Sequence, residues 1–212
     1  MKRVLSFLLL ALCPSLAIPR DRDPYLYACS GNNFMEEDAG QPRTIVSSPD
    51  GRKRIAMTKP KVFAVSIDGR IVRTLRYRDI SAGIETGWSP DSTQFFVMYS
   101  AGGAIGDYHV HLFRISSGKV VETATPRRVA ADFHKKHSCA TRTNNLLFLG
   151  WTADSTQALL VAEVYPTSDC EKPGLFRGYL VDTRDAVIRE RFGEQRTERI
   201  KEACRVSGVV SY

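Results

Sequence analysis

The 212-residue sequence lacks the patterns that mark several large protein classes. No apolar run reaches the roughly 18 residues that a membrane-spanning helix needs. There is no C-x-x-C pair, no G-x-S-x-G elbow and no H-E-x-x-H motif. The glycine-rich segment 102–106 lacks the Lys-Ser/Thr pair of a phosphate-binding P-loop, so we interpret it as a hairpin loop. The sequence therefore predicts no catalytic residue, no cofactor and no resident metal.

The composition is that of a folded, slightly basic domain. The chain carries 30 Lys and Arg against 23 Asp and Glu, and 43% of it is hydrophobic. This length and composition bound it to one domain, or at most two small ones, with a sizeable core. Fifteen glycines and ten prolines spread along the chain indicate many turns and short strands.

The first 17 residues have the pattern of a secretory signal peptide. Lys2 and Arg3 precede an apolar run, Val4–Leu12, and Ser15-Leu16-Ala17 ends in small residues suited to cleavage after Ala17. We expect a mature chain of residues 18–212 that is periplasmic or secreted and has no transmembrane segment. The removed segment holds two bases and no acids, so the formal net charge falls from +7 to +5.

Export gives the remaining cysteines a structural interpretation. The mature chain keeps four cysteines, Cys29, Cys139, Cys170 and Cys204. Four cysteines in an oxidising compartment predict two disulfides, with three possible connectivities. Cys139 and Cys170 flank the first two strands of one predicted hairpin at its open end. The other two cysteines lie near the chain ends, which are often close in space. We therefore predict the pairs Cys139–Cys170 and Cys29–Cys204.

The strongest pattern is an internal repeat. The segment Gly87–Gln94 (Gly-Trp-Ser-Pro-Asp-Ser-Thr-Gln) returns as Gly150–Gln157 (Gly-Trp-Thr-Ala-Asp-Ser-Thr-Gln), with six of eight positions identical. A looser copy lies at Ser47–Gly51, where Pro49 and Gly51 suit a tight turn. Such a period indicates an array of similar supersecondary units.

Each copy of the motif lies within the same succession of β-prone segments. A short strand precedes the motif, and three more follow it, separated by loops and polar turns. Four short strands per unit, repeated three times, are typical of propeller blades. The blade-like units span about residues 44–78, 84–123 and 146–190, and the last strand of the third unit is expected at Ala186–Ile188. We predict an all-β fold, a partial propeller-like array of four-stranded antiparallel sheets with two short helices.

The motif resembles the TolB-type β-propeller repeat of bacterial envelope proteins. The resemblance rests on Trp88-Ser89-Pro90-Asp91 and on the turn, strand, loop, strand and Asp-Gly turn pattern, over about residues 44–191. It implies structural roles, in which Asp and Pro shape a turn and Trp packs between blades. These roles fall on Pro49, Asp50, Trp88, Pro90, Asp91, Trp151 and Asp154. Ser47 replaces the Trp of the first copy, and Ala153 replaces the Pro of the third.

Two helices are expected outside the repeats. In a helical insertion, residues 125–138, Thr125 is placed to cap the helix and Pro126 to occupy its first position. A C-terminal helix is expected over residues 194–205. These helices and residues 18–43 can cover the apolar faces that the end blades would leave bare, with Ile55, Met57, Leu159 and Val161 among the affected residues. We therefore favour a monomer, with a homodimer of shared blades as the alternative.

The four histidines form two pairs at chelating spacings. His109 and His111 share one face of a strand, and His134 and His137 lie three residues apart on the insertion helix. A metal-assisted enzyme that uses these histidines is therefore an alternative function. We favour packed or solvated histidines, because no carboxylate completes either pair as a known motif.

Basic residues gather in several segments, among them Arg52-Lys53-Arg54, Arg127-Arg128 and Lys135-Lys136. Export argues against a nucleic-acid ligand, so these residues are expected to form a solvated face or to meet an anionic partner. The expected function is that of an exported, non-enzymatic binding module that engages a protein or anionic component of the cell envelope. A further alternative is a structural subunit that contributes blades to a larger assembly.

Overall fold

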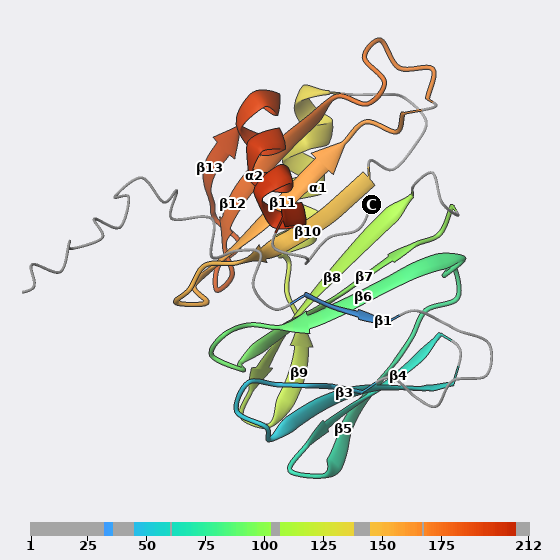
Figure 1. Ribbon diagram of the computed structural model, residues 1–212, viewed down its shortest axis with the longest axis vertical. Helices are drawn as coiled ribbons and strands as arrows, with labels where there is room; N and C mark the ends of the chain where they lie inside the picture. The colour runs from blue at the N-terminus through green and yellow to red at the C-terminus, as the bar shows by residue number, and fades with distance from the viewer. Residues whose placement is uncertain are drawn as a thin grey trace, which may run out of the picture.

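Three antiparallel sheets follow one another along the chain in this computed structural model (Figure 1). The structure describes residues 32–35, 45–59, 61–102, 107–137, 145–166 and 168–206, of which 32–35, 82–83 and 203–206 are described by backbone alone. The first blade contains β2 (Ile45–Ser47), β3 (Lys53–Lys59), β4 (Val62–Ile67) and β5 (Arg70–Arg76). The second contains β6 (Ala82–Trp88), β7 (Gln94–Ser100), β8 (Tyr108–Ser116) and β9 (Lys119–Glu122). The third contains β10 (Asn145–Trp151), β11 (Gln157–Glu163), β12 (Phe176–Asp182) and β13 (Ile188–Phe192).

These sheets confirm the predicted all-β class, with two differences in detail. A fifth strand, β1 (Asn32–Met35), pairs antiparallel with β6 and extends the middle sheet. The last strand of the third blade was expected at Ala186–Ile188, but β13 begins only at Ile188. The turn is longer because Ala186 has a positive φ of 58° and the Asp185 carboxylate accepts the Val187 N–H.

The repeated motif forms the same hydrogen-bonded turn in each blade. The hydroxyl of Ser48, Ser89 or Thr152 donates to the carboxylate of Asp50, Asp91 or Asp154, respectively. The same carboxylate accepts a backbone N–H two residues later. Hydrogen bonds from Lys53 and Ser48 lower the pKa of Asp50 to about 2. The motif thus fixes the turn between the first and second strands of a blade.

The blades are also linked to one another at these turns. The backbone N–H of Asp50 donates to the Ser92 hydroxyl of the second blade at 3.0 Å. The backbone N–H of Asp91 donates in the same way to the Ser155 hydroxyl of the third blade at 3.1 Å. Both serines have a φ of 62°, which places their side chains toward the preceding blade. The identical Asp-Ser pair in the two full copies therefore serves the contact between blades.

Two apolar cores lie between the blades. Ile55 and Phe63 of the first blade pack in one core with Trp88 and Phe95 of the second. The opposite face of β7 packs against the third blade, where the Phe96 ring lies 4.2 Å from that of Phe148. Because both faces of β7 are covered, all seven of its residues are buried.

The two tryptophans of the motif lie in different cores. Trp88 belongs to the core between the first and second blades, and its indole N–H donates to the Val46 carbonyl at 3.1 Å. Trp151 belongs to the core between the second and third blades and lies against Phe148. Its indole N–H is buried and has no hydrogen-bond partner among the residues that the structure describes.

The helices lie beside the third blade (Figure 1). Helix α1 (Thr125–Lys136) contacts β8, β11 and β12, and its buried Val129 and Phe133 belong to the core between the second and third blades. Helix α2 (Glu194–Val206) packs on β12, and its Ile200 is buried. No helix in the described part of the chain is long and apolar enough to cross a membrane.

The end blades do not leave the expected apolar residues bare. Leu159 and Val161 pair with Leu180 and Gly178 on the face of the third blade that carries α2, and both are almost fully buried. Ile55 is fully buried because it faces the second blade, and the half-buried Met57 packs against the same core. The expectation was wrong for Ile55 and Met57, since β3 presents them to the neighbouring blade.

Several predictions fall wholly or partly outside the described residues. These include the signal peptide, residues 1–17, the segment 18–31 and most of the glycine-rich loop. Cys170 is disulfide-bonded. Cys29 and Cys139 lie outside the described residues, and the Cys204 side chain is not described. The pairs Cys139–Cys170 and Cys29–Cys204 therefore stay predictions.

Candidate anion-binding pocket

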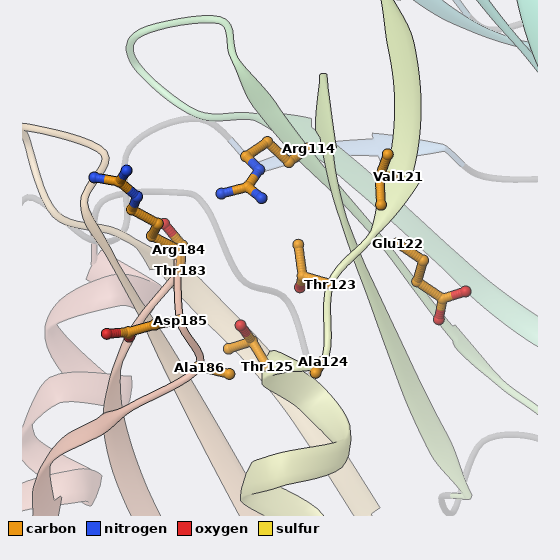
Figure 2. Close-up of a pocket in the computed structure, with 10 residues that line it drawn as sticks. All are labelled: Arg114, Val121, Glu122, Thr123, Ala124, Thr125, Thr183, Arg184, Asp185 and Ala186. Carbon is orange, nitrogen blue, oxygen red and sulfur yellow. The ribbon is translucent and has the colours of Figure 1, made fainter. Parts of the chain in front are cut away.

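A pocket of about 220 Å³ opens where the second blade, helix α1 and the third blade meet (Figure 2). Arg114 on β8 and the segment Val121–Ala124 at the end of β9 form one side of it. The turn between β12 and β13, Thr183–Ala186, forms the other side, and Thr125 forms the floor. Seventy residues separate Arg114 from Arg184, so only the packing of the blades brings them to one site.

Two arginines give the pocket its charge. The Arg114 guanidinium lies over Thr123 and Thr125, while Arg184 rises from the opposite rim (Figure 2). Neither guanidinium forms an ion pair with a described residue. Arg114 is half-buried and Arg184 is exposed. Two unpaired cations at one concave site favour an anionic ligand.

The two carboxylates near the pocket are turned away from it and engaged elsewhere (Figure 2). The Glu122 carboxylate contacts His111 Nδ1 at 2.9 Å. The Asp185 carboxylate accepts the Val187 N–H at 3.1 Å and lies 3.9 Å from Arg189. These acids therefore do not neutralise Arg114 and Arg184.

Helix α1 presents its N-terminus to the same pocket. Thr125 was expected to cap the helix, but it is the first helical residue, and the cap position belongs to Ala124. Alanine has no side-chain acceptor, so no side chain caps the helix, and its first turn contains no acid. An uncapped helix N-terminus carries a partial positive charge and attracts anions.

Two threonine hydroxyls in the pocket have no hydrogen-bond partner within the described ranges of the chain. Thr125 is 0% exposed, and its hydroxyl points toward Thr123 and Arg114 (Figure 2). The Thr123 hydroxyl is likewise buried without a partner among the described residues. A buried polar group without a partner is costly, and such groups mark functional sites. Both hydroxyls can donate to a bound oxyanion.

A second cavity of about 370 Å³ adjoins the first and shares Ala124, Asp185 and Ala186 with it. Its other lining residues come from α1 and from the start of β13: Arg128, Asp132, Val187, Ile188 and Arg191. Arg191 binds Asp132 through two hydrogen bonds, of 2.9 and 2.7 Å, which lower the pKa of Asp132. The two cavities therefore adjoin along Ala124, Asp185 and Ala186.

No histidine is among the described residues that line either cavity. His109 and His111 stack on Tyr99 and contact Asp107 and Glu122, respectively. His134 is exposed on α1, and His137 follows the helix and packs on Phe133. Burial and the nearby Arg177 lower the pKa of His137. Among the described residues, no group of three or more His, Cys, Asp and Glu side chains lies together in a metal-binding arrangement.

Sequence reasoning identified part of the site's surroundings and missed its centre. Arg127-Arg128 was recognised as a basic pair, and Thr125 was assigned to the helix start. Arg114 and Arg184 are isolated in the sequence, one on a strand and one in a turn, so no local pattern marks them. No protein-family model matches the chain, and no curated protein is significantly similar to it.

Proposed function

We propose that this protein is an exported, non-enzymatic binding module that recognises an anionic group on a component of the cell envelope. The pocket of Arg114, Arg184, Thr123 and Thr125 is the binding site. The observation that carries the proposal is that Arg114 lies over two buried hydroxyls, with Arg184 on the opposite rim, at an uncapped helix N-terminus; neither arginine has an ion-pair partner and neither hydroxyl a hydrogen-bond partner among the described residues. The signal-peptide pattern that ends at Ala17 supports the exported location.

The chemistry of the pocket suits a tetrahedral oxyanion such as phosphate. Such an ion accepts several hydrogen bonds at once, and the pocket offers guanidinium, hydroxyl and backbone N–H donors. None of these groups is a nucleophile activated by a neighbouring base, so the arrangement favours binding over catalysis. The described lining residues include no cysteine or histidine.

Titration of the purified chain with inorganic phosphate, followed by calorimetry or NMR, tests this proposal. We expect saturable binding that weakens as the salt concentration rises, because added ions screen the attraction. Arg114→Ala should reduce the affinity at least tenfold. Thr125→Val should also weaken binding, because it removes the buried hydroxyl donor.

The matched control is Arg70→Ala. Arg70 is exposed on β5, in the first blade, and its loss changes the net charge by the same amount. It should leave phosphate affinity unchanged. Equal losses of phosphate affinity in Arg114→Ala and Arg70→Ala would mean that binding depends only on net charge, and the assignment of the pocket would then be wrong.

A separate experiment tests the exported location. Sequencing the N-terminus of the exported chain shows whether it is cleaved after Ala17.

A further inference from the structure

The two adjoining cavities differ in chemistry. The first is cationic and lined by hydroxyls, whereas the second combines an internally neutralised ion pair with short apolar side chains. Because the two cavities share Ala124 and Ala186, a ligand with an anionic group in the first cavity has room to extend into the second. The part of the ligand that lies in the second cavity must therefore be chemically different from the anionic group in the first.

The second cavity suits a polyhydroxyl ring. Arg191 already neutralises the Asp132 carboxylate and fixes its orientation. The carboxylate oxygens can therefore accept hydrogen bonds from a neutral ligand. Arg128 adds donors and forms no ion pair within the described part of the chain. Sugar hydroxyls both donate and accept hydrogen bonds, so they can engage both kinds of group.

The apolar part of the second cavity supports the same assignment. Val187 and Ile188 line it, and Val187 is 41% exposed. These short side chains can contact the C–H face of a sugar ring. A nucleobase would favour an aromatic side chain to stack on, and no aromatic residue is among the described residues that line this cavity. The volume of about 370 Å³ falls within the roughly 300–1,000 Å³ of small-molecule sites.

We propose that the two cavities together bind a phosphorylated sugar, with the phosphate in the first cavity and the sugar ring in the second. This inference rests on the proposed function and adds the identity of the ligand to it. The same chemistry occurs in a free sugar phosphate and in a phosphorylated sugar of an envelope glycan.

Parallel titrations with inorganic phosphate, glucose and glucose 6-phosphate test the inference. We expect glucose 6-phosphate to bind at least tenfold more tightly than phosphate, and glucose alone to bind far more weakly than either. Val187→Tyr fills the second cavity without changing the charge. It should reduce the affinity for glucose 6-phosphate to that for phosphate and leave phosphate binding intact. Val72→Tyr, at a residue 38% exposed on β5, is the matched control.

The outcomes separate this inference from the proposed function. If phosphate binds through Arg114 but glucose 6-phosphate binds no more tightly, the sugar assignment is wrong and the anion site stands. If neither ligand binds, both proposals are wrong. A phosphoserine peptide that binds more tightly than glucose 6-phosphate would overturn the sugar in favour of a protein ligand. Retention of a phosphorylated envelope glycan, lost after enzymatic dephosphorylation, would identify the glycan rather than the free sugar phosphate as the source.

Discussion

Trp88 and Trp151 occupy equivalent positions in two blades but differ in one hydrogen bond. The indole N–H of Trp88 donates to the Val46 carbonyl, whereas that of Trp151 has no partner in the described part of the chain. Substitution by Phe removes the same volume at both positions. At Trp88 it also removes the hydrogen bond to the Val46 carbonyl, and at Trp151 it removes a buried N–H that has no partner among the described residues.

We therefore predict that Trp88→Phe lowers the free energy of unfolding by about 1–3 kcal/mol more than Trp151→Phe does. Urea denaturation of both variants measures the difference. Alanine at either position should cost about 3–5 kcal/mol, because both side chains are buried in cores between blades. A larger loss in Trp151→Phe than in Trp88→Phe would contradict the assigned role of the hydrogen bond.

Glu85 gives the protein a pH-dependent stability. Its side chain is buried on β6, one carboxylate oxygen lacks a partner among the described residues, and burial raises its pKa from 4.5 to about 7. The folded state thus holds the proton more tightly than the unfolded state. Stability therefore falls as the pH rises from about 4.5 to about 7, and is independent of this group outside that window.

We predict that the Glu85 contribution amounts to roughly 3 kcal/mol across this window. Glu85→Gln should lose this fall, since an amide stays neutral throughout. Denaturation of wild type and variant at several pH values between 4 and 8 measures it. The exposed Glu171→Gln variant is the control. If the stabilities of wild type and Glu85→Gln changed with pH in parallel, the pKa of Glu85 would not be raised by folding, and the prediction would be wrong.

At the scale of elements, one glycine determines how closely α2 approaches the third blade. A Cβ on Gly178 would lie 2.8 Å from both Phe192 Cδ2 and Thr197 Oγ1. The Gly178 N–H also donates to Thr197 Oγ1 at 2.9 Å. Any larger residue at this position must push α2 away from β12.

We predict that Gly178→Ala destabilises the protein by about 1–3 kcal/mol, because overpacking displaces the helix. Gly193 provides the control, since a Cβ there meets nothing within 4 Å. Gly193→Ala should change the stability by less than about 1 kcal/mol. Chemical denaturation gives the stabilities, and hydrogen exchange in α2 shows whether the helix has loosened. Unchanged exchange in Gly178→Ala would argue against this contact.

The elements that the sequence predicts well are those with local causes. The turn at Asp91 depends on side chains within five residues, and the apolar strands after each turn are continuous runs. The pairing of β1 with β6 joins segments about 50 residues apart, and Asn32–Met35 carries no strand pattern of its own. No sequence rule specifies such a pairing.

The candidate site shows the same division. The helix and its Thr125-Pro126 start were predicted, but a difference of one residue in the cap position changes the role of Thr125. In the structure its hydroxyl faces the pocket instead of a backbone N–H. The approach of Arg184 to Arg114 depends on how two blades pack, which residue patterns within each blade do not encode.

At the scale of the whole molecule, α2 is the cover of the third blade. Leu159, Val161 and Leu180 are buried on the face of that sheet which carries α2. Without α2 this apolar face meets water, at a cost of roughly 25 cal/mol per Å². The chain needs either its own helix or another molecule to cover it.

We predict that the full chain is a monomer and that deletion of residues 194–212 causes aggregation or a new dimer. Light scattering at micromolar concentration measures both states. Deletion of residues 207–212, which leaves α2 in place, should preserve the monomer. A full-length dimer would instead favour a structural role in which chains share blades.

The serine links between blades give the array a direction. Each link runs from an Asp backbone N–H in one blade to a Ser hydroxyl in the next, from Asp50 to Ser92 and from Asp91 to Ser155. The first copy carries Gly51 at the serine position, and no described blade precedes it. The series therefore has a head and a tail, and at its tail no further blade follows the Asp154 turn among the described residues. A further repeat unit with a serine at the matching turn position would extend the array in the same direction from the third blade.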